Sequence, residues 1–224
     1  MCIRDSDKVL DALERAEATG LVETVSTGWF RFSHALVQHN LYAEISPTRR
    51  SRMHLRVAEA LEDLDLAGRR PAEAARHWVA SGSAKGVPRA IHLSCDAGVK
   101  ASEALAPQEA SRHYATALDL LARLDEDDEA LRCELLLLLA EAQCEAGDPQ
   151  FRQNVVDAAA IADRLGDTDR LIRAALTDYQ RGYMSIDDPD RVRILRQALA
   201  AAGEGDSPCL LYTSSRGRGS LHGT

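Results

Sequence analysis

The histidine with the most informative position in this sequence is His34. It directly follows an aromatic run, WFRFS, and opens a segment whose apolar residues recur every three or four positions, as in a helix. The predicted inward stripe of this helix consists of His34, Val37, Leu41 and Ile45. An imidazole at a helix N-terminus lies among backbone N–H groups that lack partners within the helix and attract anions. The pattern therefore predicts one of two roles for His34, contact with an anion or packing on the inward face.

The remaining chemically capable side chains form no catalytic or metal-binding pattern. Five other histidines have no serine, aspartate or cysteine at catalytic spacing: His39, His54, His77, His92 and His113. Cys95, Cys133 and Cys144 form no C-x-x-C pair and have no histidine at zinc-ligand spacing. We therefore expect three buried thiols in a reducing compartment, the cytoplasm, and no bound metal. The acidic run DEDD (125–128) lacks the spacing of a calcium loop, so we expect a solvated loop there.

The two ends of the chain, residues 1–6 and 209–224, are expected to be sequencing or cloning scars. MCIRDS and the later CLLYTS can be written in codons that are reverse complements of one another. Both are similar to a transposon end used to fragment DNA for sequencing. We therefore set both segments aside from fold reasoning and expect them to pack against nothing. On this interpretation, residues 7–208 are a piece of a longer protein.

Composition favours an acidic, helical protein. The formal charge is −8, and the two ends contribute +2 through Arg216 and Arg218, so the retained segment carries −10. Such a domain repels nucleic acid unless a local basic patch dominates. Aromatic residues make up 4% of the chain, which together with abundant Ala, Leu, Arg and Glu is typical of stacked helices. No apolar run reaches the roughly 18 residues that a membrane span needs, so we expect no membrane partner.

Residues 7–45 are expected to form the C-terminal half of a winged-helix module. Apolar residues at helical spacing predict a helix over 7–19. The next segment alternates apolar and polar residues on both sides of a glycine-containing turn, which predicts a β-hairpin over 21–32. A second helix is predicted over 33–45, with Ser33 as its N-cap. A helix followed by a hairpin is typical of the back half of a winged helix.

Residues 46–70 are expected to contain a linking helix. Pro47 is well suited to its first turn, and the helix is predicted to run over 48–64. Its spacing predicts four buried side chains, Met53, Val57, Leu61 and Leu64. The basic run RRSRMHLR lies in this helix without interleaved aromatic residues. We therefore expect a solvated face or a contact surface for another module, rather than a nucleic-acid site.

Residues 71–208 are expected to form tetratricopeptide-like helix pairs. Small residues and one aromatic residue stand at the offsets that this repeat uses: Gly98, Ala110, Tyr114 and Ala117. Small residues let paired helices cross closely, and the aromatic ring fills the neighbouring groove. Two further segments, LLAEAQCEAGD and RAALTDYQRGY, repeat the first-helix half 35 positions apart, close to the repeat's period of about 34. We therefore predict an all-α fold, a winged-helix remnant with one short β-hairpin followed by an α-solenoid. Trp29 and Trp78 are expected to be packing residues.

The long run RFSHALVQHNLYAEISPTRRSRMHLRVAEALE resembles a junction found in the bacterial signal-transducing ATPases of the STAND class, including LuxR-type and adenylate-cyclase-linked regulators. In that family a winged helix ends with a phenylalanine–x–histidine–x–leucine segment, a tyrosine follows, and an arginine-rich helix begins the repeats. RCELLLLLAEAQCEAGDP, IADRLGD and RGYMS are similar to the family's helical region. The resemblance covers nearly all of residues 7–208 and contains no catalytic signature.

The resemblance implies that a P-loop ATPase module precedes this region and that the winged helix closes over bound nucleotide. His34 stands at the position of the family's winged-helix histidine, which contacts the β-phosphate of ADP. The resemblance therefore implies that His34 senses ADP in the intact parent. Two neighbours depart from the pattern, since Phe32 replaces the methionine neighbourhood and Ala35 stands in place of an aspartate. The chain has no G-x-x-x-x-G-K-[ST], so we expect no cofactor in the fragment and ATP or ADP only in the parent.

The leading hypothesis is a non-catalytic regulatory segment of a multidomain ATPase switch. The winged-helix remnant would couple nucleotide state to the repeats, whose concave side would receive a protein or small-molecule signal. The parent's output would be transcription or cyclic-nucleotide synthesis, with nucleic acid met only through missing domains. Two alternatives stay open, a stand-alone tetratricopeptide scaffold for protein interaction and a DNA-binding winged-helix regulator that uses residues 7–32.

Overall fold

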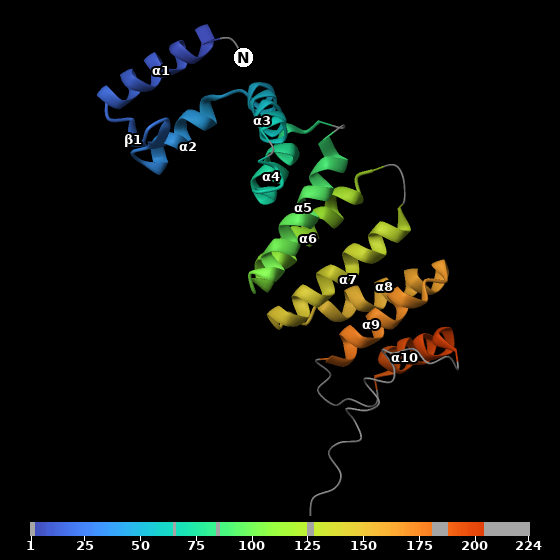
Figure 1. Ribbon diagram of the computed structural model, residues 1–224. Coiled ribbons are helices and arrows are strands. Elements are labelled where there is room, and N and C mark those ends of the chain that lie inside the picture. The colour runs from blue at the N-terminus through green and yellow to red at the C-terminus, as the bar shows by residue number, and fades with distance from the viewer. Residues whose placement is uncertain (1–2, 65, 84–85, 125–127, 181–187, 204–224) are drawn as a thin grey trace, which may run out of the picture.

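From residue 47 onward the chain folds into a row of helices that pack on one another in sequence order, and a small hairpin lies near the N-terminus (Figure 1). A computed structural model describes residues 3–64, 66–83, 86–124, 128–180 and 188–203. Its helices are α1 (Ile3–Ala18), α2 (Ala35–Glu44), α3 (Pro47–Asp63), α4 (Pro71–Ser81), α5 (Gly86–Glu103), α6 (Pro107–Leu121), α7 (Glu129–Ala146), α8 (Phe151–Leu165), α9 (Thr168–Gln180) and α10 (Pro189–Ala202). Between residues 50 and 200 the described residues contain no strand, which confirms the predicted all-α body with one short hairpin.

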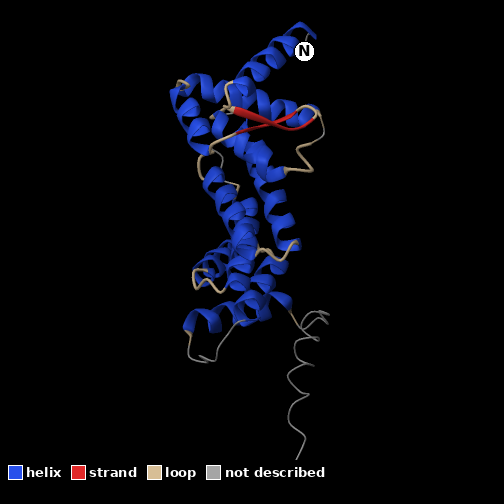
Figure 2. Cartoon of the chain, turned by 90° about the vertical axis from the view of Figure 1, so that its left-hand side faces the viewer, coloured by secondary structure: helices blue, strands red, loops and turns tan. Residues whose placement is uncertain are grey.

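We define the N-terminal unit as α1, the hairpin and α2. The hairpin is a two-stranded antiparallel sheet of β1 (Val22–Ser26) and β2 (Trp29–Phe32), and it is the pair of red strands in Figure 2. Val22 lies opposite Phe32, and Gly28 supplies the turn with φ of 77°, a conformation that glycine adopts without strain. The hairpin therefore lies where the alternating pattern predicted it.

Three details of the N-terminal unit differ from the prediction. α1 begins at Ile3, inside the segment set aside as a scar, because IRDS contains no proline or glycine that would stop a helix. The N-cap of α2 is His34 rather than Ser33, whose hydroxyl instead donates to the Gly20 carbonyl oxygen at 2.7 Å. Trp29 is 61% exposed rather than packed, since none of the described elements covers its side of the hairpin.

Some predictions fall on parts of the chain that the structure does not describe. The side-chain packing predicted for residues 1–6 and 209–224 is one of them. Most of the acidic run at 125–128 and the glycine that would close the last repeat half, Gly182, lie outside the described residues as well.

α3 begins at Pro47, one residue before the predicted start, and its inward face differs from the predicted stripe. Ala58 and Leu61 are its buried residues, whereas Met53 and Leu64 are 47% and 67% exposed. The inward face is turned toward α4, on which α3 packs, and the small Ala58 lets the two helices approach closely. Trp78 of α4 is buried in the same cluster, as expected for a packing residue, and its Nε1–H donates to Glu62 at 3.1 Å.

The pairing of α5 with α6 confirms the predicted contact between a small residue and an aromatic ring. A Cβ placed on Gly98 would lie 2.4 Å from Cε1 of Tyr114, so the ring occupies the space that glycine leaves open. Ala110 and Ala117 are fully buried on the same side of α6 as Tyr114. Gly98 therefore sets how closely the two helices approach.

The core consists of three apolar clusters along the row of helices. One is centred on α7 to α10, one on α3 to α6, and a small one joins α6 to α7 around Tyr114. Leu118 of α6 is half-buried and packs against all three. α7 contributes to every cluster because its LLLLL run presents apolar side chains around the whole helix, and Leu135 and Leu137 are both fully buried. The row of helices α3 to α10 is hereafter called the helix array.

Candidate functional site

His34 lies at the first turn of α2 with its backbone in the extended conformation of an N-cap residue. Its carbonyl oxygen accepts from the N–H groups of Val37 and Gln38, at 3.0 and 3.3 Å. The His34 side chain makes no capping hydrogen bond and is exposed, and none of the described residues of α2 is buried. In the described part of the chain nothing covers the His34 side chain, so the packing role predicted for His34 finds no partner there. Its role as an ADP sensor stays a prediction.

The N-terminal unit leaves almost all of its apolar side chains in contact with solvent. Among residues 7–45, only Val22 is buried. The exposed apolar residues come from all four elements and the connection after α1: Val9, Leu10, Leu21, Val25, Trp29, Phe32, Leu36, Leu41 and Tyr42. Contiguous exposed apolar patches are typical of interaction sites, which makes the N-terminal unit a candidate for one.

A second exposed apolar surface lies on the outer side of α3. We define the α3 outer face as Met53, Val57, Ala60, Leu61 and Leu64, which with Arg56 line a shallow hollow of about 340 Å³. All of these side chains except Ala60 were assigned to the core by the sequence pattern, and Leu61 is shared between the two sides of the helix. The prediction of an apolar stripe on this helix was correct, but three of its side chains, Met53, Val57 and Leu64, are exposed instead of buried.

Three side chains from three helices meet where the N-terminal unit joins the helix array. The Tyr42 hydroxyl of α2 lies 2.8 Å from Nε2 of His54 on α3, and Nδ1 of His54 lies 2.9 Å from Nδ1 of His77 on α4. Arg50 of α3 stacks over the Tyr42 ring, with its guanidinium carbon 5.1 Å from the ring centroid. We call this chain of hydrogen bonds the junction. α2 has no extensive packing contact with α3 or α4 in the described part of the chain, so the junction is its main attachment.

The electrostatics of the junction favour neutral imidazoles. Burial lowers the pKa of His54, and the positive charges of Arg76 and Arg50 lower it further. Burial also lowers the pKa of His77, with Arg76 and His54 acting in the same direction and Glu73 opposing them. Both rings are therefore mainly uncharged at neutral pH, which allows one Nδ1 to donate a hydrogen bond to the other.

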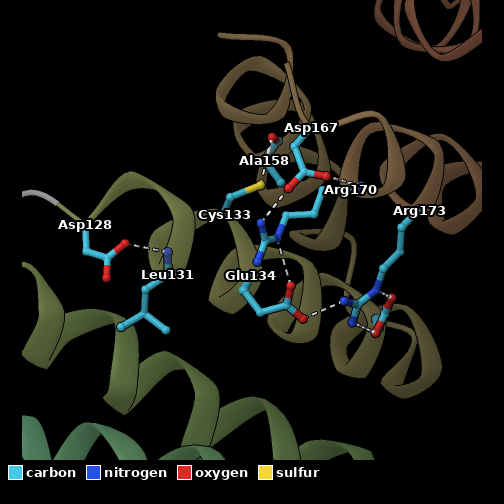
Figure 3. A network of polar contacts seen from close by, with 9 residues as sticks. Asp128, Leu131, Cys133, Glu134, Ala158, Asp167, Arg170 and Arg173 are labelled. Atoms are coloured by element: carbon cyan, nitrogen blue, oxygen red, sulfur yellow. Dashed lines mark hydrogen bonds and ion pairs between the residues drawn. The ribbon is translucent and has the colours of Figure 1, made fainter. Parts of the chain in front are cut away.

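Farther along the helix array, an ion-pair network joins α7 to α9 (Figure 3). Glu134 accepts from Arg170 Nε at 2.9 Å and from Arg173 at 2.6 Å, and Arg173 also makes a two-bond contact with Glu141. Asp167, in the turn before α9, accepts from Arg170 at 2.6 Å. Burial alone would raise the pKa of Glu134, but its hydrogen bonds with Arg173 and Arg170 outweigh burial and lower it. Since every charge in this network has an opposite partner, we interpret it as structural.

The cysteines are positioned as packing residues. Cys133 and Cys144 are buried, as predicted, whereas Cys95 is only half-buried. Burial, assisted by the charge of Asp96, raises the pKa of the Cys95 thiol to about 11, and burial also raises that of Cys133. Both thiols are therefore protonated and weakly nucleophilic at neutral pH. Among the described residues, no group of three histidine, cysteine or acidic side chains could hold a metal ion, and no helix is long and apolar enough to cross a membrane.

Sequence reasoning missed the junction. His54 and His77 are 23 positions apart on separate helices, and no local motif links them. A pattern of histidines would have identified them only if the crossing of α3 and α4 had been known. Comparison of the chain with family models, with curated proteins and with solved structures found no match.

Proposed function

We propose that this chain is a non-catalytic regulatory segment. Its N-terminal unit docks on another protein module, and its helix array couples this docking to a surface that receives a signal. The observation that supports this proposal is that Val22 is the one buried residue among residues 7–45, whereas nine large apolar side chains of this segment are exposed. An isolated unit of this kind gains little from burial, whereas docking would remove these side chains from water at roughly 25 cal/mol for each Å² covered.

The chemistry of the α3 outer face describes the partner. Its apolar stripe, Met53, Val57 and Leu64, is exposed and flanked by the exposed Arg52 and Arg56. A matching surface would be apolar at its centre and carry carboxylates at its rim, because a charged rim supports orientation and rapid association. The resemblance to the STAND class suggests that this partner is a P-loop ATPase module. The exposed His34 would then be free to reach its nucleotide.

The test joins the full chain to a P-loop module encoded in frame upstream of it and measures ADP affinity by titration calorimetry. We expect the joined protein to bind ADP more tightly than the module alone, while the chain by itself binds neither ATP nor ADP. His34→Ala should weaken ADP binding by about 1–3 kcal/mol, the strength of one charge-assisted hydrogen bond. His39→Ala, at another exposed histidine of α2, is the matched control and should leave ADP affinity unchanged.

Equal ADP affinity with and without this chain would contradict the proposal. Thermal melting of the same variants separates sensing from packing. Because the His34 side chain is exposed, His34→Ala should leave the melting temperature unchanged while ADP affinity falls. A lower melting temperature with unchanged ADP affinity would assign His34 to structure alone.

A stand-alone tetratricopeptide scaffold is the second candidate, favoured by the continuous apolar clusters of the helix array. Those clusters involve no residue of the N-terminal unit, so the array has its own core. The genomic reading frame upstream of Asp7 distinguishes the two candidates. A P-loop in frame upstream supports the regulatory segment, whereas a start codon near Asp7 supports the scaffold.

A further inference from the structure

The junction is the feature of the molecule whose hydrogen bonding depends most directly on protonation. The contact between Nδ1 of His54 and Nδ1 of His77, at 2.9 Å, needs one nitrogen to carry a proton and the other to lack it. When both rings are charged, two N–H groups face each other and the bond cannot form. A charge on one ring is compatible with the bond, because the charged ring donates to the neutral one. The hydrogen bond is therefore lost when the second proton binds.

We propose that the Tyr42–His54–His77 junction is a proton-sensitive latch that holds α2 against the helix array. The latch connects α2, α3 and α4 through two hydrogen bonds. Tyr42 lies at its outer end on α2, which belongs to the N-terminal unit, whereas α3 and α4 belong to the helix array. Opening the latch leaves α2 attached through the short Ile45–Ser46 connection. The orientation of the N-terminal unit then depends on the protonation of two imidazoles.

The charges around the latch make its second proton unfavourable in the closed form. Arg50 on α3 and Arg76 on α4 both face the imidazoles, and Glu73 on α4 is the opposing carboxylate. Arg76 and Glu73 also line a hollow of about 680 Å³ that His113 of α6 shares. Burial is the largest cause of the lowered pKa of both imidazoles, and the nearby positive charges outnumber the negative one, so the closed form excludes protons that the open form accepts.

The sign of the pH effect follows from this difference. The pKa values of both histidines are lowered from 6.5, so the latch has its full strength above pH 6.5 and loses it as pH falls through the lowered values. The ratio of open to closed forms then rises by up to about tenfold per pH unit for each proton that the closed form excludes. This inference concerns the attachment of α2 and stands whether or not the N-terminal unit docks on an ATPase module.

The experiment measures the distance between α2 and the helix array by pulsed electron paramagnetic resonance. Spin labels are placed on Gln38→Cys and Asp119→Cys, both at exposed positions, in a full chain whose accessible cysteines are replaced by serine. We expect a narrow distance distribution at neutral pH that broadens as the pH falls to about 5. Circular dichroism on the same samples checks that the helix array stays folded.

Two variants isolate the latch from other titrating groups. His77→Asn places an amide near the position of Nδ1 that can bond to His54 but cannot take up a proton, so the distribution should stay narrow over the whole pH range. His92→Asn is the matched control at an exposed histidine of α5 beside Asp96, and it should broaden as the wild type does. A wild-type distribution that does not change with pH, or a His77→Asn distribution that broadens as in the wild type, would overturn the proposal.

Discussion

Adding a single methyl group at Gly98 should measurably destabilise the helix array. In Gly98→Ala the new Cβ would lie 2.4 Å from Cε1 of Tyr114 and 2.7 Å from Cδ1 and Cζ, distances well inside van der Waals contact. The ring cannot rotate into solvent, because Tyr114 is only 2% exposed and packs among Ala110, Leu139 and Ala142. α5 and α6 must therefore move apart.

Two opposing terms set the size of this effect. Overpacking of a filled core costs about 1–3 kcal/mol. Alanine is a better helix former than glycine by about 0.5–1 kcal/mol, which offsets part of that cost. The free energy of unfolding should therefore fall by about 1–2 kcal/mol. Urea denaturation followed by circular dichroism measures this free energy. If its slope against urea concentration is unchanged, the variant exposes the same amount of surface on unfolding as the wild type.

Gly68→Ala is the matched control, because a Cβ at Gly68 would have no neighbour within 4 Å and the residue does not need a left-handed backbone. It should be neutral or slightly stabilising. Tyr114→Leu supplies the coupling test. If the methyl group clashes with the ring, the double variant should be more stable than the sum of the two single effects predicts. A neutral or stabilising Gly98→Ala would refute the close-packing argument for this helix pair.

Two further predictions concern the network between α7 and α9. Arg173→Met should lower the free energy of unfolding by about 1–2 kcal/mol. The reason is that Glu141 loses its two-bond partner at a site that is only partly exposed. Urea denaturation at low and high salt measures this loss. A loss of stability that is the same at both salt concentrations would argue against an electrostatic origin. Because hydrogen bonds lower the pKa of Glu134, its contribution to stability is present above pH 4.5 and decreases as pH falls through the lowered value. Glu134→Gln should therefore flatten the fall in urea midpoint on acidification, and an equally steep fall in the variant would contradict this assignment.

The sequence predicted the elements better than their partners. The hairpin could be predicted because alternation and Gly28 act locally, and the Gly98–Tyr114 contact could be predicted because a known repeat fixes the offset between the two residues. The face of α3 could not be predicted in this way. Met53, Val57 and Leu64 of its strongest apolar stripe are exposed, and the buried residues of the helix are Leu61 and the small Ala58. Periodicity identifies an amphipathic face but does not say which molecule covers it.

The residues of the candidate site show the same difference between local patterns, which the sequence reveals, and contacts between elements, which it does not. His34 was found from its position at the start of a helix, and its exposure follows from the absence of a covering element in the described residues. The junction was missed because it depends on how three helices cross. Tyr42, His54 and His77 come together only when α2, α3 and α4 are placed in space, and no spacing rule encodes that arrangement.

Leu118 has a consequence for how the helix array comes apart. In a stack of repeats each unit contacts mainly its neighbours, so the ends can fray while the middle persists. Leu118 packs against all three apolar clusters, and α7 contributes buried side chains to each of them, so neighbouring units share part of their packing. Cooperativity between the clusters in this protein therefore depends on Leu118 together with α7, in the middle of the row. Partial unfolding should start at the two ends and stop at α6.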